Sequence, residues 1–404
     1  MFAATRRNLQ MPLLAILAGA IGALLLPRAA SPDAQPTLRG ADGAASGGVD
    51  AHLERVCLER IEAALAAADA PPPSPLPPQP PPPQPPQPPQ PPQPPQPPPP
   101  PPPSLVLGMA RGIDASSAYR FVRSLRAAMP YARAVVFTDA ASLAADASLR
   151  DIYEAFGATL VEFDLARDVP PAAAAWHPSS YRWLLMRDWL RAHVAAAAPS
   201  ADAGAIFFAD VRDSVFQGDV FAAAAERGGE GTVPLRGFFA FKESRHLTIA
   251  ADPVNRDWLK DCFGATGLAD VGSNVISCSG TSLGEARAAL AYAEAMSETL
   301  MERRSCERMG VDQGVHNFLV YSGALAARLE ALVPVAPLAL ISNEDGFVAT
   351  VQTMPELVRD RAGRVLNAAA VPYAVVHQYD RSPALKRQYA GEYVWLNEAE
   401  LREK

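Results

Sequence analysis

Several features that would point directly to a function are missing from this chain of 404 residues. It has only four cysteines and no C-x-x-C pair, which argues against a structural zinc site. No G-x-G-x-x-G pattern follows the first predicted strand and no glycine loop carries a P-loop lysine, so dinucleotide oxidoreductases and phosphate-loop NTPases are disfavoured. The net charge is -7 and no basic stripe is present, which argues against nucleic-acid binding.

Proline, in contrast, is concentrated in one tract. Residues 71–103 contain 25 prolines and 6 glutamines, with Ser74 and Leu76 as the remainder. Because proline has no backbone N–H, this tract should form polyproline II and extend on the order of 100 Å at ~3.1 Å per residue. We interpret it as a semi-rigid spacer, with a ligand for proline-recognition domains as the alternative. A cell-wall structural protein is disfavoured, because 301 residues with globular composition follow the tract.

The N-terminus has the pattern of a membrane anchor. Residues 11–26 form an uncharged apolar run of sixteen residues preceded by Arg6 and Arg7, which favours a cytoplasmic N-terminus and a translocated body. We therefore expect a cytoplasmic tail and signal-anchor in 1–30, with a cleaved signal peptide or an organelle transit peptide as alternatives. A disordered stem would fill 31–103. This layout is typical of a single-pass type II enzyme of the Golgi or another secretory-pathway membrane, although no Asn-x-Ser/Thr sequon supports a luminal head.

The cysteines leave two questions open. Cys262, Cys278 and Cys306 lie in the head, and one disulfide among them is expected if the head is luminal, without a defined pairing. Cys57 could link two stems into a homodimer or remain an inert thiol.

The head, residues 104–404, alternates apolar runs with amphipathic segments. Short apolar runs predict strands, and apolar residues that recur every three or four positions predict helices. Strands separated by helices are typical of a parallel sheet covered on both faces, so we expect an α/β fold. Strands are expected at 105–108, 134–137, 159–163 and 205–208, and helices at 118–129, 149–156 and 181–198.

Acidic residues follow two of these strands. In such sheets ligands bind beyond the carboxyl ends of the strands, where we expect Asp139 and Asp210. The segment IFFADVRDSVFQGDVF at 206–221 brings Asp210 and Asp213 into one loop. Two carboxylates supply the hard oxygen ligands that a divalent cation prefers. In the structural alternative, Asp210 caps a helix and Arg212 pairs with a nearby acid.

Three downstream segments carry further polar residues. A strand at 374–376 leads into His377, whose neutral imidazole could complete a metal site and suits manganese better than calcium; a surface or capping histidine is the alternative. Residues 277–280, SCSG, predict a small-residue turn at which the backbone could approach a ligand closely. Asp312 begins the predicted helix DQGVHN. Its side chain could face the crevice beyond the carboxyl ends of the strands, or it could be an ordinary N-cap.

Together these segments resemble the nucleotide-sugar-dependent glycosyltransferases of the GT-A fold, over roughly residues 105–389. The glycogenin-like and lipopolysaccharide galactosyltransferase-like branches are similar in the strand-terminal acidic motif, the small-residue turn, the Asp-Gln helix start and the late histidine. DVRDSVFQGD, SCSGTSLG, DQGVHNFLVY and VVHQYDR also look similar to plant and algal nucleotide-diphosphosugar transferases. The resemblance implies a GT-A, Rossmann-like, mostly parallel sheet flanked by helices in 104–404.

The resemblance also implies a role for each matching residue. Asp210, Asp213 and His377 would hold a Mn²⁺ or Mg²⁺ ion against the phosphates of a sugar nucleotide. The spacing here is D-x-x-D, whereas the family has D-x-D. This difference concerns whether Asp213 binds the metal directly, and Arg212 could be the residue that turns outward instead. The remaining residues are Asp312 and Gln313 as catalytic residues at the donor sugar or acceptor hydroxyl, and Arg182, Arg212, Ser279, Gly280, Arg381 and Lys386 as donor-binding residues. Arg182 is equally interpretable as a solvated helix residue.

The sequence thus predicts a metal-dependent glycosyltransferase that moves a hexose or pentose from a nucleotide-diphosphate donor to a glycan or glycoprotein acceptor. The alternative is a catalytically inactive GT-A-fold binding protein tethered to a membrane by the proline-rich stalk, because no obvious general base is present. Acceptor choice resides in loops that one sequence does not decode, so the donor sugar, the acceptor and the stereochemical outcome stay open.

Overall fold

The computed structural model describes residues 104–196, 204–227, 237–303, 306, 308–332 and 337–395, all of which belong to the unit Pro94–Lys404. The expected anchor (1–30) and stem (31–103) lie outside the described residues. Among the helices described, none combines the length and the apolar composition needed to cross a bilayer.

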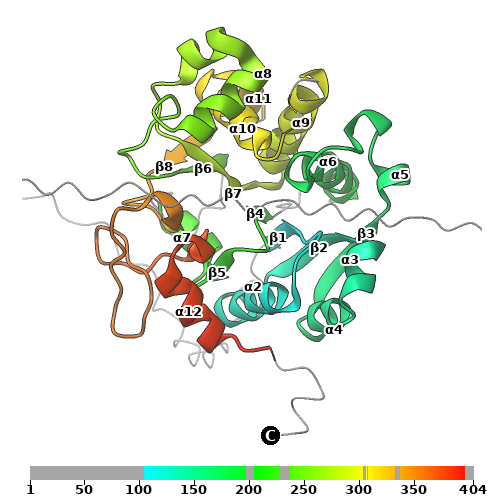
Figure 1. The fold of residues 1–404 in the computed structure, drawn as a ribbon, viewed down its shortest axis with the longest axis vertical. Coiled ribbons are helices and arrows are strands. Elements are labelled where there is room, and N and C mark those ends of the chain that lie inside the picture. Colours follow the sequence, from blue (N-terminus) through cyan, green and yellow to red (C-terminus); the bar gives the residue numbers. More distant parts are fainter. Residues whose placement is uncertain are drawn as a thin grey trace, which may run out of the picture. The chain divides into compact units, whose positions relative to one another are not determined.

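The centre of the head is a seven-stranded sheet within the described residues (Figure 1). The first four strands in the spatial order pair in parallel, whereas β7 runs antiparallel to both of its neighbours, and the last pair is again parallel. This is the predicted α/β class, with the mostly parallel sheet flanked by helices that the GT-A resemblance implies. The order is β3 (Ala158–Phe163), β2 (Arg133–Asp139), β1 (Ser104–Met109), β4 (Ala205–Ala209), β7 (Ser277–Glu285), β6 (Phe238–Lys242) and β8 (Leu338–Ile341).

Each face of the sheet buries its own apolar core. Alternate side chains of a strand point to opposite faces, so Leu105 and Leu107 of β1 enter one core and Val106 enters the other. The first core packs under α6, α9 and α10, and the second under α2, α4 and α7, so that the two groups of helices lie on opposite sides of the strands in Figure 1. Strands buried on both faces explain why these segments read as uninterrupted apolar runs.

The helices begin and end where local chemistry allows. Asp114 caps the first helix by accepting the Ser117 N–H at 2.9 Å, and Gly264 (φ 67°) kinks α8 into two segments. The bounds are α2 (Ala115–Ala128), α3 (Ala140–Ala145), α4 (Ser148–Ala155), α5 (Leu165–Asp168), α6 (Pro178–Ala196), α7 (Val220–Arg227), α8 (Pro253–Val271), α9 (Ala286–Glu302), α10 (Val311–Tyr321), α11 (Ala324–Glu330) and α12 (Pro383–Glu392).

A second, three-stranded sheet brings the C-terminal part of the chain to the loop after β4. It consists of β5 (Ser214–Phe216), β10 (Val375–His377) and β9 (Val348–Thr350), with β10 in the middle. β5 and β10 are antiparallel, and their register sets His377 opposite Ser214. Because Asp213 directly precedes Ser214, this pairing carries His377 to the acidic loop.

Two details differ from the sequence-based expectations. Residues 277–280 start the buried strand β7 and do not form a turn, since small side chains also suit a strand that is tightly covered on both faces. Gly310 (φ 86°) is the N-cap of α10, so the interpretation of Asp312 as an N-cap is wrong. The cysteine pairing is now defined: Cys262 and Cys306 form a disulfide with Cα atoms 5.1 Å apart, and Cys278 is a buried free thiol.

Candidate metal and donor site

Three metal-ligating side chains from separate elements meet beyond the end of β4. Asp210 follows β4, Asp213 precedes β5, and His377 ends β10. Their ligand atoms all lie within 4.8 Å of one another. The Nε2 atom of His377 is 3.6 Å from Oδ2 of Asp210 and 3.4 Å from Oδ1 of Asp213. The fold therefore brings together the three residues that the sequence named as metal ligands.

Two atoms of this cluster are buried without a hydrogen-bond partner among the described residues. They are Oδ1 of Asp213 and Nε2 of His377, whose side chains are 2% and 1% exposed. A buried polar atom without a partner is costly, and each such atom needs an explanation. A divalent cation between the two would satisfy both, and two carboxylates plus an imidazole fit the preferences of Mn²⁺. The donor set and the orphaned atoms thus fit a metal ion.

Gly280 leaves the space that such an ion would need. A Cβ atom at this position would lie 2.5 Å from Cε1 of His377, 2.7 Å from its Nε2 and 2.8 Å from Oδ2 of Asp210. The Gly280 carbonyl also accepts the Asp210 N–H at 2.9 Å, which fixes the loop against β7. The glycine is required here for close approach of the backbone to the site.

Arg182 on α6 ties the metal cluster to α10. Its guanidinium donates through Nη1 to Oδ1 of Asp210, and through Nη2 to Oδ2 of Asp312 at 3.0 Å and to the Ser279 carbonyl at 3.1 Å. The side chain is only 7% exposed, which excludes the interpretation as a solvated helix residue. Burial opposes the charge of Arg182, but Asp210 and Asp312 together raise its pKa above the usual value.

The protonation equilibria show which charge the cluster favours. Burial alone would raise the pKa of Asp210, but Arg182 and His377 hold it well below its usual value. Burial likewise opposes the charged form of His377, yet Cys278, Asp213 and Asp210 raise its pKa well above normal. The pKa of Asp312 is raised, mainly by burial and against the effect of Arg182. The two aspartates thus favour a positive charge at His377.

Asp312 and Gln313 lie in the first turn of α10. Oδ2 of Asp312 accepts from the Ser279 hydroxyl at 3.1 Å as well as from Arg182. The Gln313 carboxamide accepts the Ser279 N–H at 3.4 Å and donates to Glu243 at 3.2 Å and to Asn255 at 2.7 Å. Asp312 therefore borders the metal cluster through Arg182, whereas Gln313 links α10 to β7 and α8.

The other predicted donor-binding residues lie at the periphery. Arg212 is about half exposed and donates to Oδ2 of Asp213 at 3.1 Å, which is the acid pairing of the structural alternative. Arg381 donates to Asp380 at 2.8 Å, and Lys386 is exposed on α12. Among the described residues, neither Arg381 nor Lys386 bonds directly to the metal cluster, although Asp380, the partner of Arg381, lies 3.9 Å from Nε of Arg212.

Asp139 ends β2 at the same edge of the parallel strands as Asp210, as expected. It accepts from Nε of Arg111 at 2.7 Å and from the Ser142 N–H at 2.9 Å, so that it also caps α3. Arg111 in turn donates to the Tyr181 hydroxyl at 2.8 Å. This edge therefore carries a second charged group beside the metal cluster.

The sequence did not single out Glu243 or assign a role to Cys278. Burial raises the pKa of Glu243 to about 7, and the side chain is 4% exposed. Glu243 directly follows the apolar strand β6, and an acid after a buried strand is the same signal that identified Asp210. Cys278 places its sulfur 3.5 Å from Nδ1 of His377, and no sequence motif marks that contact.

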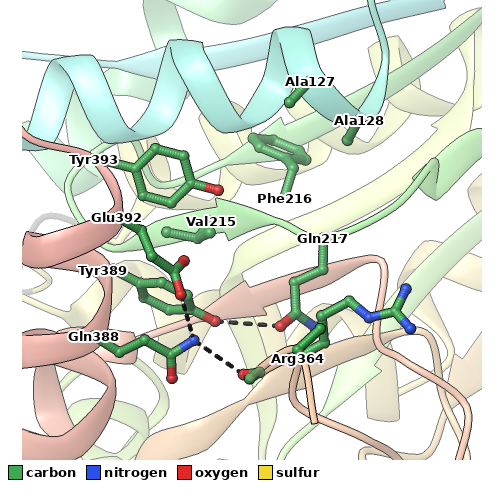
Figure 2. Close-up of a pocket in the computed structure, with 12 residues that line it drawn as sticks. Ala127, Ala128, Val215, Phe216, Gln217, Arg364, Gln388, Tyr389, Glu392 and Tyr393 are labelled. Atoms are coloured by element: carbon green, nitrogen blue, oxygen red, sulfur yellow. Dashed lines mark hydrogen bonds between the residues drawn. The ribbon is translucent and has the colours of Figure 1, made fainter. Parts of the chain in front are cut away.

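A separate pocket of about 220 Å³ lies between α12, β5 and the end of α2 (Figure 2). Its polar groups bond to one another: Gln388 donates to Glu392 at 2.8 Å, and the Tyr389 hydroxyl donates to Gln217 at 3.3 Å. None of the candidate metal ligands lines it. With these internal bonds, the pocket offers no chemistry comparable to that of the metal cluster.

Glycosyltransferases are among the solved structures that are similar to this chain. The galactosyltransferase LgtC, in complex with donor and acceptor sugar analogs, is 13% identical, with 74% of this chain and 100% of that chain covered and a TM-score of 0.42. GlyE of Streptococcus pneumoniae TIGR4 is 12% identical (75% and 63% covered, TM-score 0.37), and the bifunctional WbbM is 18% identical (55% and 38%, TM-score 0.33). No protein-family model and no curated protein matches the chain. Similarity at this level assigns no activity, so the chemistry of the site follows from its geometry.

Proposed function

We propose that the head is a metal-dependent glycosyltransferase that transfers a sugar from a nucleotide-diphosphate donor to a glycan or glycoprotein acceptor. The observation that carries this proposal is the convergence of Asp210, Asp213 and His377 beyond the end of β4, with two of their buried atoms orphaned. Mn²⁺ is the proposed ion, because the set contains an imidazole, and Mg²⁺ is the second choice. We also propose that the chain is related to the plant and algal nucleotide-diphosphosugar transferases, because DVRDSVFQGD, SCSGTSLG, DQGVHNFLVY and VVHQYDR look similar to theirs.

Breaking the bond from sugar to nucleotide diphosphate develops negative charge on the leaving phosphate. A cation held by Asp210, Asp213 and His377 would supply Lewis-acid stabilisation of that charge. Arg182 keeps Asp210 ionised and oriented, because its guanidinium donates to that carboxylate from a buried position. Gly280 keeps the space before His377 and Asp210 free of side-chain atoms. Asp312, fixed by Arg182 and Ser279, is the carboxylate that the resemblance assigns to the donor sugar or the acceptor hydroxyl.

We further propose that the chain works as a single-pass type II protein of the Golgi or another secretory-pathway membrane. The uncharged run 11–26, the two preceding arginines and the spacer 71–103 support this layout. Under this proposal the head is luminal, and the disulfide between Cys262 and Cys306 is compatible with an oxidising compartment.

The proposal is tested by screening sugar nucleotides for turnover by the full-length chain, with and without Mn²⁺. Asp210→Asn and Asp213→Asn remove one ligand charge each, and the new carboxamide at 210 can still accept from Arg182. We expect each variant to lose about 100- to 1,000-fold in turnover with little change in melting temperature. Asp188→Asn, at an exposed position on α6, is the control and should behave as wild type. Wild-type turnover by Asp210→Asn would exclude the metal role.

A sugar-nucleotide-binding protein without transferase activity is the second candidate. The observation that favours it is the carboxamide of Gln313, whose oxygen and nitrogen are both engaged by protein groups. Calorimetry separates the two candidates. A binding protein would hold the donor in the presence of Mn²⁺ without consuming it, whereas the enzyme would release the nucleoside diphosphate.

A further inference from the structure

The side of His377 that faces away from the aspartates has a specific partner. Nε2 faces Asp210 and Asp213, and Nδ1 on the other side of the ring lies 3.5 Å from the sulfur of Cys278. The sulfur is buried in β7. Among the described residues, this sulfur is the atom that contacts Nδ1 of His377.

A histidine that binds a metal through one nitrogen must carry its proton on the other. A metal-bound histidine usually donates this remaining N–H to a carboxylate, a backbone carbonyl or water, and this bond orients the ring. Here the atom in that position is a sulfur, which is a weak acceptor. Cys278 cannot be a ligand of the same ion, because the imidazole ring separates its sulfur from the Nε2 side.

We propose that Cys278 is a positioning residue of the metal site: its sulfur accepts the Nδ1–H of His377 and so holds the ring with Nε2 directed at Asp210 and Asp213, where it binds the ion. This inference rests on the proposed metal role of His377. It gives a task to a buried thiol that forms no disulfide, while the other two cysteines of the head are bonded to each other.

The first test measures Mn²⁺ binding to the full-length chain without any sugar nucleotide, by electron paramagnetic resonance of the free ion. We expect Cys278→Ala to weaken Mn²⁺ binding about 10- to 100-fold, as for other partners of metal-bound histidines. Cys278→Ser should retain part of the affinity, because its hydroxyl oxygen can also accept. If the alanine variant does not fold, the serine variant alone carries the comparison with wild type.

Ser277→Ala is the matched control, because Ser277 is the adjacent buried residue of β7 and its hydroxyl contacts His316 at 2.9 Å, away from His377. A purely structural role of Cys278 predicts that both alanine variants lower the melting temperature and leave Mn²⁺ affinity unchanged. That result would overturn the proposal.

The second test reads the tautomer directly. Nitrogen-15 spectra of the Zn²⁺-loaded chain, with the His377 signals assigned from His377→Ala, should show the proton on Nδ1, and this signal should shift in Cys278→Ala. A proton on Nε2 would overturn the proposal. So would a sulfur-to-cobalt charge-transfer band in the Co²⁺-loaded chain, because it would make Cys278 a ligand.

The proposed function and this inference fail differently. If wild type binds Mn²⁺ and Cys278→Ala binds it more weakly, but wild type turns over no sugar nucleotide, the transferase proposal is contradicted and the positioning role is supported. Wild-type protein that turns over the donor while Cys278→Ala binds Mn²⁺ normally contradicts the positioning role alone. A wild-type chain that binds no Mn²⁺ contradicts both.

Discussion

Arg182 is the residue on which the charge balance of the site depends most. It places one guanidinium between Asp210, which is 34% exposed, and Asp312, which is 3% exposed. Attraction between buried charges repays the cost of their desolvation only when the geometry is good and the remaining donors are bonded. The two terminal nitrogens of Arg182 meet this condition through two carboxylates and a carbonyl, whereas its Nε is buried without a hydrogen-bond partner among the described residues. Removal of Arg182 therefore leaves negative charge buried without compensation.

Arg182→Met should therefore lower the free energy of unfolding by about 3 to 5 kcal/mol. Arg182→Lys should lose less, since it keeps the charge but not the planar fork that reaches two carboxylates at once. Chemical denaturation gives the comparison. Arg191→Met is the control on the same helix: Arg191 is half exposed and pairs with Glu294, so we expect a change below about 1 kcal/mol. Equal denaturation midpoints for Arg182→Met and Arg191→Met would contradict this account.

Glu243 should make stability depend on pH. Burial raises its pKa from 4.5 to about 7, so between these values the folded state binds more protons at this site than the unfolded state. Its contribution to the free energy of unfolding therefore falls as pH rises through this window and is constant above it, by on the order of 3 kcal/mol in total. Glu243→Gln removes the titrating group.

The measurement is the difference in unfolding free energy between Glu243→Gln and wild type, from denaturation at pH 5, 6, 7 and 8. We expect this difference to move in favour of the variant as pH rises to about 7 and then to level off. A difference independent of pH would show that Glu243 is ionised throughout, and the variant would then report only on its bond to Gln313.

At the scale of elements, β7 carries two glycines with different surroundings, one at the metal cluster and one in the apolar core. Substituting each in turn distinguishes metal binding from stability. Gly280 faces the metal cluster, whereas a Cβ atom on Gly284 would meet the Phe238 ring at 2.8 Å. Gly280→Ala should abolish Mn²⁺ binding, because its methyl group would lie 2.7 Å from Nε2 of His377. Gly284→Ala should instead lower stability by about 1 to 3 kcal/mol and leave Mn²⁺ affinity intact. Titration calorimetry and thermal denaturation distinguish them; a Gly280→Ala protein that binds Mn²⁺ normally would move the ion elsewhere.

The same strand marks where sequence-based prediction stops. β1, β2 and β4 were predictable because each is a mostly buried apolar run, and their helices show the matching periodicity. β3 is an edge strand in which only Ala158 and Phe163 are buried, and its short apolar run was sufficient to predict it. β7 was not, because Ser277, Cys278 and Ser279 lack the β-branched and aromatic residues that indicate strands, and its burial comes from neighbours far along the chain. β5 and β9 are three residues long each and exist only through their pairing with β10.

Site residues follow the same division. Asp210, Asp213 and His377 could be named because an acidic motif and a late histidine stand at strand ends. The link from Arg182 to Asp312 spans 130 positions and that from Cys278 to His377 spans 99, and neither distance leaves a local pattern. Glu243 follows a strand as Asp210 does, but one acid at a strand end is a weak signal without a second ligand nearby.

For the molecule as a whole, the site forms only when distant parts of the head have folded together. β4 and β7 belong to the main sheet, His377 reaches them through the small sheet, and Arg182 and Asp312 come from the helical layer on one face. Contacts between residues far apart in sequence require loop closure before they stabilise the fold. A variant that loosens the attachment of the small sheet should therefore affect metal binding even when it contacts none of the ligands.

The disulfide between Cys262 and Cys306 allows a test at this scale, because it closes a loop with a sequence separation of 44 that contains β7 and α9. Changing both cysteines to alanine should lower the free energy of unfolding by about 4 kcal/mol, through the larger entropy of the unfolded chain. Mn²⁺ affinity of the folded fraction should stay within about twofold, since neither cysteine contacts the metal cluster. Reduction by dithiothreitol should destabilise wild type by a similar amount and leave the double variant unchanged. If wild type is equally stable in both redox states, the bond does not constrain the head.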